Sequence, residues 1–469
     1  MNLQNQLDKK IFKIVADAAI ELKYDTYVVG GFVRDILLKR SSKNLDIDFV
    51  CVGNGERLAK LIASKLKDSS IKIFKNFGTA HITYNNQNYE FVGARKESYR
   101  INSRNPIIED GTLEDDQKRR DFTINAMAIS LNKNNYGKLI DPFNGINDLK
   151  HKIIRTPLNP NDTYSDDPLR MMRAIRFASQ LKFKIETKSK EAIKKNTDRL
   201  NIISQERITE ELNKIILSEN PSVGLNLLSE TKLLRVFFEE FESLKGVETI
   251  NNLSHKDNFY HTLEVLENIS RKTQNLWLRW AAILHDIAKP QTKKFEKNIG
   301  WTFHAHDFIG SKMVPKIFKK LKLPLNDKMK YVQKLVALHL RPIVLAQDIV
   351  TDSAVRRLLF DAGDDIDDLM TLCDADITSK NIRKVNRYLD NFQLVRKKLK
   401  EVEEKDRIRN WQPPINGIEI MKEFNIEAGK ELGILKNLIK NAILDGEIKN
   451  TKEHALIFLR KKAKELNII

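Results

Sequence analysis

Two aspartates at alternate positions, Asp46 and Asp48, are the residues of this chain whose types and spacing most clearly suggest chemistry. In a β-strand, residues i and i+2 project from the same face, so the two carboxylates would share one face while Ile47 and Phe49 anchor the other in a core. Neighbouring carboxylates repel each other unless a cation lies between them, and Mg²⁺ binds one or two carboxylates together with phosphate oxygens. The pair therefore predicts a Mg²⁺ site for metal-assisted phosphoryl or nucleotidyl transfer, although an isolated Asp-x-Asp on a strand is more often simply solvated.

A glycine pair and an arginine precede the aspartates and strengthen the prediction of a phosphate-binding site. Gly30 and Gly31 follow the apolar run 27–29, and glycines there let the backbone approach a ligand closely. Exposed amides and the start of a following helix favour a phosphate group. Arg34 adds a forked donor suited to triphosphate oxygens, whereas Asp35 could simply cap the helix or pair with Arg34.

The segment 119–128, RRDFTINAMA, is a second candidate for nucleotide binding. Arg119 and Arg120 could neutralise phosphate charge, and Asn125 could donate a hydrogen bond to a sugar or to the backbone. The alternative is an ordinary strand-to-helix junction in which Asp121 caps the helix.

The segment 166–177, DDPLRMMRAIRF, predicts a helix that begins near Asp167, a suitable N-cap, with proline at its first position. Asp167, Arg170 and Arg173 would lie in one sector of this helix, with Arg176 turned further round. An aspartate and an arginine one turn apart can act as acceptor and donor against the edge of a base. The alternative is a capped amphipathic helix with solvated arginines.

Histidine is scarce in the chain, yet several histidines fall in one region of its second half together with two aspartates. The candidate metal ligands there are His261, His285, Asp286, His306, His339 and Asp376, with His304 as an alternative to His306. Imidazole and carboxylate together suit a divalent transition metal, and two such ions can activate a water molecule against a phosphodiester. Any one of these histidines alone would more often be an ordinary core or surface residue.

The elements that would position these residues divide the chain into two kinds of structure. The predicted strands are 26–29, 46–52, 71–74, 81–84 and 89–92, with a hairpin turn at 85–88 and a helical periodicity over 56–66. After Pro157 the apolar positions recur at spacings of three and four, and the chain is predicted to be almost entirely helical, with one of its breaks at 251–258. The fold class is therefore α+β, with a compact head that carries a small sheet and a long helical body.

The composition indicates the class of binding partner and the cellular compartment of the protein. Lys and Arg number 81 against 63 Asp and Glu, and the net charge of +18 favours a polyanion, with nucleic acid first, over a merely Lys-rich composition. No apolar run reaches the roughly 18 residues of a membrane span, and the N-terminus lacks an apolar signal core. The two cysteines, Cys51 and Cys373, are far apart and fit a reducing compartment, so we expect a cytoplasmic protein without membrane contact.

Taken together, the motifs of the first half resemble those of the class II tRNA nucleotidyltransferases (CCA-adding enzymes) and the bacterial poly(A) polymerases. In chain order the matching motifs are Gly30-Gly31-Phe32-Val33-Arg34-Asp35, Asp46-Ile47-Asp48, Arg119-Arg120-Asp121-Phe122-Thr123-Ile124-Asn125-Ala126, Asp166-Asp167-Pro168-Leu169-Arg170 with Arg173 and Arg176, and the neck-like Ser204-Gln205-Glu206-Arg207-Ile208. The resemblance covers about the first 215 residues. In the second half, the order of histidines and aspartates resembles that of the HD phosphohydrolase superfamily.

The resemblance implies a polymerase-β-type nucleotidyltransferase head with a small mixed sheet, followed by an all-α neck, an HD-like body and a tail. The corresponding parts are 1–155 for the head, 156–245 for the neck, 246–385 for the HD-like body and 386–469 for the tail. Asp46 and Asp48 would bind Mg²⁺, with one ion activating an RNA 3′-hydroxyl and the other holding the triphosphate. The implied nucleotide contacts are Gly31, Arg34 and Arg120 for phosphates and sugar, Asp167 and Arg170 for the Watson–Crick edge of CTP or ATP, and Arg173 and Arg176 near the triphosphate.

Three points stay open within the resemblance. A third catalytic carboxylate could be Glu90, on a neighbouring strand, or Asp121. Asp166 stands where the family usually has glutamate, which keeps the charge on a shorter side chain. The segment 93–114 looks like the family's flexible loop, which fits an enzyme able to add the final A.

The resemblance implies a CCA-adding enzyme that transfers CMP and AMP from CTP and ATP to tRNA 3′ ends, with the helical body binding tRNA through phosphate contacts. One alternative is a poly(A) polymerase or an enzyme that adds only the final A. Another is an HD-type phosphohydrolase or RNA-binding protein with a vestigial head, which the intact aspartate pair disfavours. The HD-like site could remove a 2′,3′-cyclic phosphate or a 2′-phosphate, or the HD fold could serve as an RNA-binding platform without metal.

Overall fold

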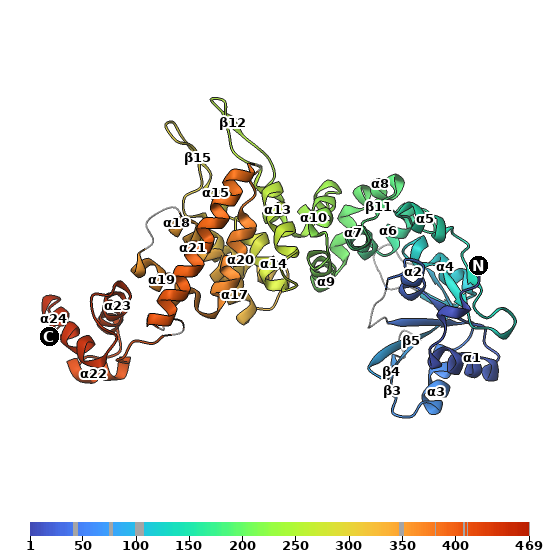
Figure 1. The fold of residues 1–469 in the computed structure, drawn as a ribbon. Coiled ribbons are helices and arrows are strands. Elements are labelled where there is room, and N and C mark those ends of the chain that lie inside the picture. The colour runs from blue at the N-terminus through green and yellow to red at the C-terminus, as the bar shows by residue number, and fades with distance from the viewer. Residues whose placement is uncertain are drawn as a thin grey trace. The chain divides into compact units, whose positions relative to one another are not determined.

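The chain folds into two compact units, Met1–Glu239 and Glu240–Ile469 (Figure 1). The computed structural model describes residues 1–40, 46–74, 78–98, 107–346, 351–379, 381–406, 409 and 411–468. The first unit combines a sheet with helices and the second is mostly helical, which confirms the predicted α+β class. The division into four parts stays a prediction, and the division between the two units falls close to its boundary at 245/246.

The elements of the first unit follow one another as strands and helices in its N-terminal part and mainly as helices thereafter. Its strands are β1 (Thr26–Val29), β2 (Ile47–Cys51), β3 (Ser70–Phe74), β4 (Thr79–Tyr84), β5 (Gln87–Gly93), β6 (Arg95–Ser98), β7 (Ile107–Asp110), β8 (Ala128–Ser130), β9 (Leu139–Ile140), β10 (Ile153–Ile154) and β11 (Lys184–Ile185). Its helices are α1 (Lys10–Leu22), α2 (Gly31–Leu37), α3 (Gly55–Lys65), α4 (Leu113–Lys118), α5 (Gly145–His151), α6 (Pro160–Asp166), α7 (Leu169–Leu181), α8 (Thr187–Lys195), α9 (Gln205–Ile216), α10 (Pro221–Glu230) and α11 (Leu234–Phe237), with α12 (Glu239–Glu242) at the boundary of the units. Short 3₁₀ turns occur at η1 (Gln4–Gln6), η3 (Thr123–Asn125), η4 (Lys133–Asn135) and η5 (Thr197–Ile202).

The main sheet of the first unit has the strand order β3-β4-β5-β2-β1-β8-β9. β2 and β5 pair in parallel and the other neighbours pair antiparallel, so the sheet is mixed, as predicted. All five strands predicted in the head are present. Asp46, predicted as the first residue of a strand, lies just before β2 instead, because the pairing with β5 begins at Ile47 opposite Tyr89.

Phe49 anchors β2 in the core of the first unit. Its ring stacks on that of Phe91 in β5 with the centroids 4.8 Å apart, and the ring of Phe12 in α1 lies 6.1 Å from it. All three side chains are fully buried. Because successive strand residues project to opposite faces, this anchoring directs Asp48 to the other face, where Val50 packs in a second buried cluster.

The second unit is built from helices and two short hairpins. Its helices are α13 (Asn258–Ser270), α14 (Leu276–Leu284), α15 (Lys289–Thr292), α16 (His306–Lys320), α17 (Asp327–Leu338), α18 (Arg341–Leu345), α19 (Asp352–Ala362), α20 (Ile366–Asp376), α21 (Ile382–Asp406), α22 (Gly417–Phe424), α23 (Lys430–Asp445) and α24 (Lys452–Glu465), with a 3₁₀ turn at η6 (Gly363–Asp365). Its strands are β12 (Thr249–Ile250), β13 (Leu253–Ser254), β14 (Lys294–Glu296) and β15 (Gly300–Thr302).

Among the described residues after Pro157, the two hairpins of the second unit and the two-residue strand β11 are the exceptions to the almost entirely helical structure that the sequence predicts. The first hairpin lies at the predicted break, where Asn251 and Asn252 have φ angles of 50° and 62°. Two successive left-handed residues make a tight turn whose twist matches that of paired strands, and asparagine tolerates this conformation. The helical periodicity on either side of Asn251 and Asn252 therefore did not reveal this turn.

Helix α14, which leads into the histidine cluster, is mostly buried. Trp280 and Arg279 are fully buried in it, and the Arg279 guanidinium donates to the backbone carbonyls of Ser270 and Thr273 at 2.9 and 2.8 Å. The charge of Arg279 is thus satisfied inside the unit. The chain leaves α14 directly into His285, which places the cluster in the interior of the unit.

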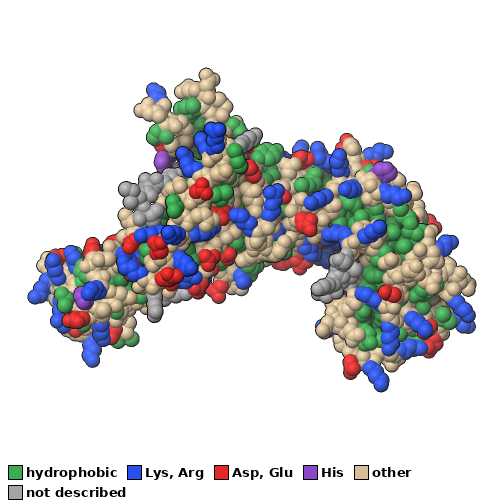
Figure 2. All heavy atoms as spheres, in the orientation of Figure 1, with side chains coloured by type: hydrophobic (Ala, Val, Ile, Leu, Met, Phe, Trp, Pro, Cys, Tyr) green, Lys and Arg blue, Asp and Glu red, His purple; other side chains and the backbone are tan. Residues whose placement is uncertain are grey.

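The described surface is rich in mixed charge. Figure 2 shows Lys and Arg side chains spread over both units on the face drawn, interspersed with Asp and Glu. Among the helices in the described part of the chain, none is long and apolar enough to cross a membrane.

Candidate active site and candidate metal centre

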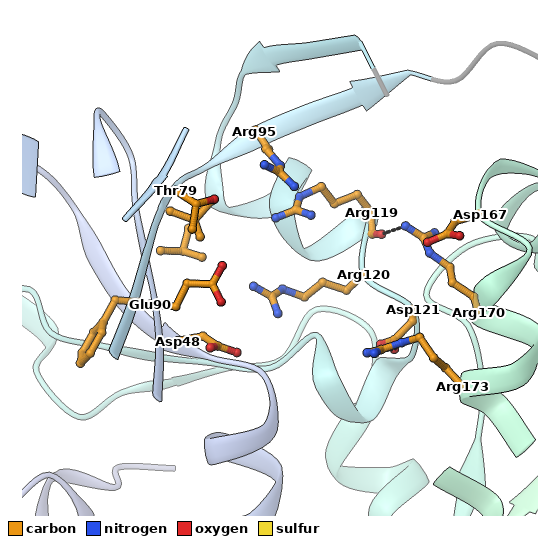
Figure 3. Close-up of a pocket in the computed structure, with 13 residues that line it drawn as sticks. Asp48, Thr79, Glu90, Arg95, Arg119, Arg120, Asp121, Asp167, Arg170 and Arg173 are labelled. Atoms are coloured by element: carbon orange, nitrogen blue, oxygen red, sulfur yellow. Dashed lines mark hydrogen bonds and ion pairs between the residues drawn. The ribbon is translucent and has the colours of Figure 1, made fainter. Parts of the chain in front are cut away.

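A cavity of about 290 Å³ in the first unit collects most of the predicted head residues (Figure 3). The cavity is lined by Asp48, Phe49, Val50, Thr79, Glu90, Val92, Arg95, Arg119, Arg120, Asp121, Asp167, Arg170 and Arg173. Two carboxylates from the sheet lie on one side and five arginines from β6, the α4–η3 segment and α7 extend across the other. Such a cavity can hold a polyanion beside acidic groups that attract a cation.

The acidic wall is made by adjacent parallel strands. Asp48 of β2 is in register with Glu90 of β5, so the two side chains project from the same face of the sheet. Burial, together with the neighbouring Glu90 charge, raises the pKa of Asp48 to about 6. Asp46 lies just before β2 with an exposed side chain, and its charge also disfavours ionisation of Asp48. These hard carboxylate oxygens fit a Mg²⁺-like cation, which would relieve their repulsion.

Gly30 allows the turn before α2 to approach this wall. Its φ is +76°, and a methyl group added at its Cα would lie 3.1 Å from Asp48 Oδ2 and 3.4 Å from Arg120 Nη1. A larger residue would therefore meet both a candidate catalytic carboxylate and a candidate phosphate ligand, in a backbone conformation that L side chains rarely adopt. Gly31 begins α2 and lies beside the Arg34 guanidinium, not in the cavity wall.

Arg34 is held by protein groups. Its guanidinium makes a two-point contact with Asp35 at 2.9 Å and donates to Asn125 Oδ1 at 2.9 Å, over the ring of Phe177. The side chain is nearly buried and does not line the cavity. The pairing of Asp35 with Arg34 considered from the sequence is therefore present, and phosphate binding by Arg34 stays a prediction.

A carboxylate that sequence analysis did not single out organises the arginine wall. Asp116 in α4 has no solvent exposure and accepts hydrogen bonds from Arg119 Nε at 2.9 Å and from Arg120 Nε at 3.0 Å. Burial alone would raise the pKa of Asp116, but Arg120 and Arg119 outweigh burial and hold it below its usual value. The acidic run 114–116 before two arginines was the available signal, since residues three and four apart meet on a helix.

Helix α7 presents an acceptor and a donor at the far side of the cavity. The Asp167 carboxylate accepts from the backbone N–H of Leu169 at 3.2 Å, but the helix begins one residue later than predicted, so that Pro168 and not Asp167 is its N-cap. Arg170 lies one turn on, and its Nη2 donates to the backbone carbonyl of Arg119 at 2.7 Å. Both side chains line the cavity together, as Figure 3 shows.

The two candidates for a third carboxylate have different surroundings. Glu90 faces Asp48 across the strand pair. Asp121 is instead fully engaged: it accepts from Arg173 at 2.6 and 2.8 Å, from Asn125 at 3.0 Å and from the backbone N–H of Phe122 at 2.8 Å. Asp121 precedes a 3₁₀ turn and strand β8, so it does not cap an α-helix as the alternative reading held. Its contacts fix Arg173 and so tie α7 to the head.

Arg176 lies away from the cavity. Its Nε donates to Glu211 of α9 at 2.6 Å, and its guanidinium lies 4.1 Å from the centroid of the Phe177 ring. The structure thus brings Asp48, Arg120, Asp167, Arg170 and Arg173 to one cavity and leaves Gly31, Arg34, Asp46 and Arg176 outside its lining. Thr79 and Arg95 are lining residues that the sequence did not predict as site residues, and part of the predicted loop, 99–106, lies outside the described residues.

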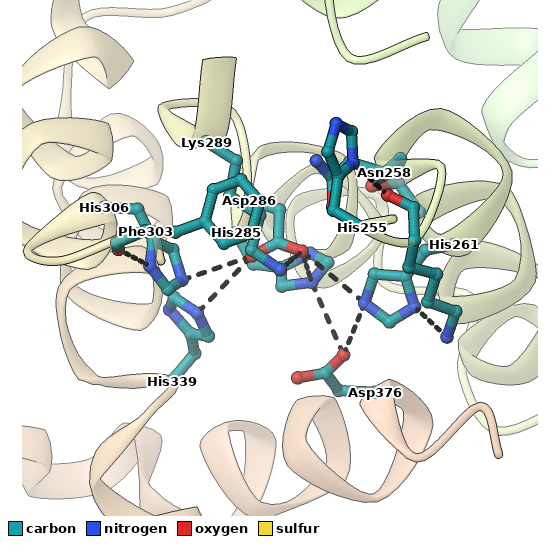
Figure 4. Close-up of polar contacts among 12 residues, drawn as sticks. His255, Asn258, His261, His285, Asp286, Lys289, Phe303, His306, His339 and Asp376 are labelled. Atoms are coloured by element: carbon teal, nitrogen blue, oxygen red, sulfur yellow. Dashed lines mark hydrogen bonds and ion pairs between the residues drawn. The ribbon is translucent and has the colours of Figure 1, made fainter. Parts of the chain in front are cut away.

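The second unit brings all six predicted metal ligands together (Figure 4). They come from α13 (His261), the end of α14 (His285 and Asp286), the start of α16 (His306), the end of α17 (His339) and the end of α20 (Asp376). Asp286 lies at the centre, with its oxygens 3.3 Å from His285 Nε2, 3.3 Å from His306 Nε2, 3.5 Å from His261 Nε2 and 4.0 Å from His339 Nε2. Asp376 Oδ1 lies 2.9 Å from His261 Nε2 and 3.5 Å from His285 Nε2. His304 is 79% exposed and faces Glu296, so His306 is the member of the cluster.

The imidazoles are oriented in the way metal ligands require. Nδ1 of His285, His306 and His339 each lies 2.7–2.8 Å from a backbone carbonyl, which fixes it as the protonated nitrogen. Nε2 of the same three residues is buried and has no hydrogen-bond partner among the residues that the structure describes. An acceptor nitrogen left unsatisfied in the interior costs free energy, and a bound metal would satisfy all three. The donor set of imidazoles and carboxylates therefore fits a divalent transition metal.

Electrostatic effects within the cluster work in opposite directions. In the metal-free cluster burial would lower the pKa of His285, but Asp286 and Asp376 outweigh burial and raise it to about 10, so a metal that binds His285 Nε2 displaces a proton. Burial and the nearby His285 lower the pKa of His339 to about 4. A cavity of about 560 Å³ reaches His261 and Asp376 and is also lined by Lys256, Tyr388 and Phe392, so a ligand has access to the cluster.

Family comparisons match three parts of the chain. Residues 26–155 match the poly A polymerase head domain, residues 182–245 the probable RNA and SrmB-binding site of polymerase A, and residues 258–381 the HD domain. The cavity of the first unit and the histidine cluster of the second thus lie mainly in the first and third of these matches.

Individual proteins extend the similarity along the chain. An A-adding tRNA nucleotidyltransferase of Deinococcus radiodurans is 28% identical over 449 residues, which cover 93% of this chain and 95% of that protein. A multifunctional CCA protein of Shewanella frigidimarina is 31% identical over 347 residues, 72% of this chain and 78% of that protein. Across five related proteins the matched part spans from 34% to 95% of the relative's length. The crystal structure of a Bacillus stearothermophilus CCA-adding enzyme in complex with CTP has a TM-score of 0.68 at 24% identity, covers 98% of this chain and 100% of its own, and shows the shared fold.

Proposed function

Because the chain belongs to the family of CCA-adding and A-adding tRNA nucleotidyltransferases and poly(A) polymerases, we propose that it adds CMP and AMP to tRNA 3′ ends from CTP and ATP. The observation that carries the proposal is one cavity with carboxylates on one wall, five arginines opposite and the Asp167–Arg170 pair at its far side. Carboxylates and arginines suit a nucleoside triphosphate, and the helix pair suits a base edge.

The chemistry divides among the residues of the cavity. Asp46 and Asp48, with Glu90, would hold Mg²⁺, which when bound activates the RNA 3′-hydroxyl and stabilises charge on the triphosphate. Arg120 and Arg173 neutralise the triphosphate and hold it for in-line attack. The base is selected by protein side chains, so no nucleic acid template enters the site.

A single acceptor–donor pair can select both C and A. Cytosine and adenine each present an amino group that donates and an adjacent ring nitrogen that accepts, whereas uracil and guanine present a carbonyl and a ring N–H there. The Asp167 carboxylate accepts only and the Arg170 guanidinium donates only, so together they complement cytosine and adenine and oppose the other two bases.

The test is incorporation on a tRNA that lacks its 3′-terminal CCA, with labelled CTP and ATP. Addition of two CMP residues followed by one AMP is the expected result. AMP incorporation only on tRNA that already ends in CC would make the protein an A-adding enzyme, and long tails on a generic RNA with ATP alone would make it a poly(A) polymerase. No incorporation with any RNA and either nucleotide would reject nucleotidyl transfer.

We further propose Glu90 as the third catalytic carboxylate. Glu90→Gln is expected to lower kcat at least about 100-fold and to raise the Mg²⁺ concentration for half-maximal rate, because it removes a charge beside Asp48. Glu56→Gln, which changes a partly exposed carboxylate at the start of α3, is the matched control and should leave both quantities unchanged. A raised Mg²⁺ requirement in Asp121→Asn but not in Glu90→Gln would assign the role to Asp121.

A second function is proposed for the second unit, as a metal-dependent phosphohydrolase. It is supported by the convergence of four histidines and two aspartates, with three Nε2 atoms in the cluster that have no hydrogen-bond partner in the described part of the chain. A divalent transition metal held there would supply an activated water for attack on a phosphate ester. A 2′,3′-cyclic phosphate or a 2′-phosphate at an RNA end is the substrate class that we propose.

Binding of tRNA and location complete the proposal. Lys and Arg of the second unit would contact tRNA phosphates, so binding should weaken steeply with salt and read shape more than sequence. Cys51 and Cys373 are both buried free thiols, one in each unit, which supports a reducing, cytoplasmic location.

A further inference from the structure

One buried carboxylate serves two arginines of the active-site cavity. The side chain of Asp116 is completely buried, and its two oxygens are divided between the guanidiniums of Arg119 and Arg120. Nε and Nη2 of Arg120 lie 3.0 and 2.9 Å from Asp116 Oδ2, and Nε of Arg119 lies 2.9 Å from Oδ1. The carboxylate itself does not line the cavity, so it acts there only through its partners.

The arginines have a competing set of acceptors across the cavity. Oδ2 of Asp48 lies 3.1 Å and Nη1 of Arg120 lies 3.4 Å from the position that a Cβ atom on Gly30 would occupy, so both groups are close to the same point. Yet Asp48 forms no ion pair within 4 Å among the described residues, and Arg120 pairs with Asp116. A guanidinium released from Asp116 would have Asp48 and Glu90 as anionic targets within the same cavity, with Glu90 also 3.6 Å from His81 Nε2. It would then occupy the acidic wall in place of a cation.

Arg119 connects Asp116 to two further residues around the cavity, Glu97 and Arg170. Its Nη1 lies 3.1 Å from Glu97 of β6, whose carboxylate also pairs with Arg95 at 2.8 Å. Its backbone carbonyl accepts from Arg170, the donor of the base-reading pair. A shift of Arg119 would therefore also displace Arg170, which faces the base in the proposed function.

We propose that Asp116 is a positioning residue that holds Arg119 and Arg120 toward the nucleotide and away from the catalytic carboxylates. It keeps the acidic wall open for the metal and the arginine wall open for the triphosphate. Burial of an anion between two cations is stable only when all three are paired, so the arrangement resists collapse in the absence of substrate. The proposal rests on the proposed nucleotidyl transfer by the same cavity.

The test is Asp116→Asn in the full chain, compared with wild type in the tRNA incorporation assay. We expect the KM for CTP and ATP to rise about 10-fold or more, since a buried, doubly paired carboxylate loses its charge. The Mg²⁺ concentration for half-maximal rate should also rise, because Arg120 then competes with the cation for Asp48. Binding of ATP in EDTA, measured by calorimetry, should weaken as well.

Asp148→Asn is the matched control. The Asp148 side chain is 3% exposed, pairs with Arg155 in the same unit and does not line the cavity. Its substitution should lower the thermal stability without raising the KM for nucleotide or the Mg²⁺ requirement. A lower Tm with unchanged KM and Mg²⁺ requirement in Asp116→Asn as well would overturn the proposal and make Asp116 a stabilising residue only.

A double variant tests the competition directly. In an Arg120→Met background, Asp116→Asn should no longer raise the Mg²⁺ requirement, because the competing guanidinium is gone. The comparison of Arg120→Met with the double variant can also be made if the single Asp116→Asn variant does not fold, because the double variant removes one of the arginine partners together with the carboxylate charge. A Mg²⁺ requirement higher than that of Arg120→Met alone would contradict the proposal. A wild-type protein that incorporates no nucleotide would instead contradict the proposed function.

Discussion

Asp48→Asn is expected to reduce CMP and AMP incorporation at least about 10³-fold, which corresponds to about 4 kcal/mol of transition-state stabilisation. Asp48 is the carboxylate that β2 directs into the cavity, in register with Glu90. The amide keeps the shape of the side chain but cannot supply the negative charge that a divalent cation requires. Single-turnover incorporation at saturating nucleotide measures the loss without contributions from product release.

Thermal unfolding separates this loss from misfolding. Burial and Glu90 raise the pKa of Asp48 from 3.8 to about 6, so the folded metal-free protein binds the proton more tightly than the unfolded chain does. Stability from this group is therefore greatest at low pH and falls as the pH rises through that range. Asp48→Asn should remove this contribution to the pH dependence, and its Tm in EDTA at neutral pH should equal or exceed that of wild type.

Asp25→Asn is the matched control, since Asp25 is an exposed aspartate directly before β1 of the same sheet. It should leave incorporation and Tm unchanged. Retention of more than a tenth of wild-type activity by Asp48→Asn would show that Asp48 does not hold the catalytic metal.

The second large effect is expected for metal binding in the second unit. Protein purified with a divalent transition metal should contain it in stoichiometric amount, and Asp286→Asn should lower the content about tenfold or more. Asp286 is the carboxylate within reach of all four histidines, so its loss affects the whole cluster. Inductively coupled plasma mass spectrometry measures the content, and nucleotide incorporation by the same sample should be unchanged.

Two substitutions act as controls for this result. Asp374→Asn alters a carboxylate of α20, the helix that also carries the cluster residue Asp376, but it pairs with Lys272 and Arg396 outside the cluster and should keep the metal. His304→Ala should also keep it, whereas His306→Ala should lose it, because His304 is exposed and His306 faces Asp286. Equal metal content in wild type and Asp286→Asn would mean that the cluster is not a metal site.

Local sequence pattern was sufficient for much of the head. Alternation along β2 placed Phe49 in the core and Asp48 on the opposite face, since burial of one face decides the register of a strand. The histidine order predicted a cluster that residues in or next to five helices, α13, α14, α16, α17 and α20, assemble. Helical periodicity predicted the body but could not show the hairpin at Asn251, which depends on two successive left-handed residues.

The interior partners of the site could not be predicted in the same way. Glu90 faces Asp48 only because β2 and β5 pair in parallel, and no local feature fixes the partner of a strand. Arg34, Arg120 and Arg176 look equivalent in the sequence and each pairs with a carboxylate, but only Arg120 lines the cavity, which depends on tertiary packing. Asp116 had the right helical spacing to its arginines, but its complete burial arises from tertiary packing.

The parallel pairing of β2 with β5 also bears on when the acidic wall of the cavity is completed during synthesis of the chain. Between these strands the chain must pass through α3, β3 and β4, so the alignment of Asp48 with Glu90 closes a long loop. Pairing across such a separation is slow, because loop-closure entropy must be overcome before the contacts form. A nascent head that has formed only β1, β2 and α3 therefore carries Asp48 without Glu90 beside it. The two carboxylates of the cavity come together only when β5 joins the sheet.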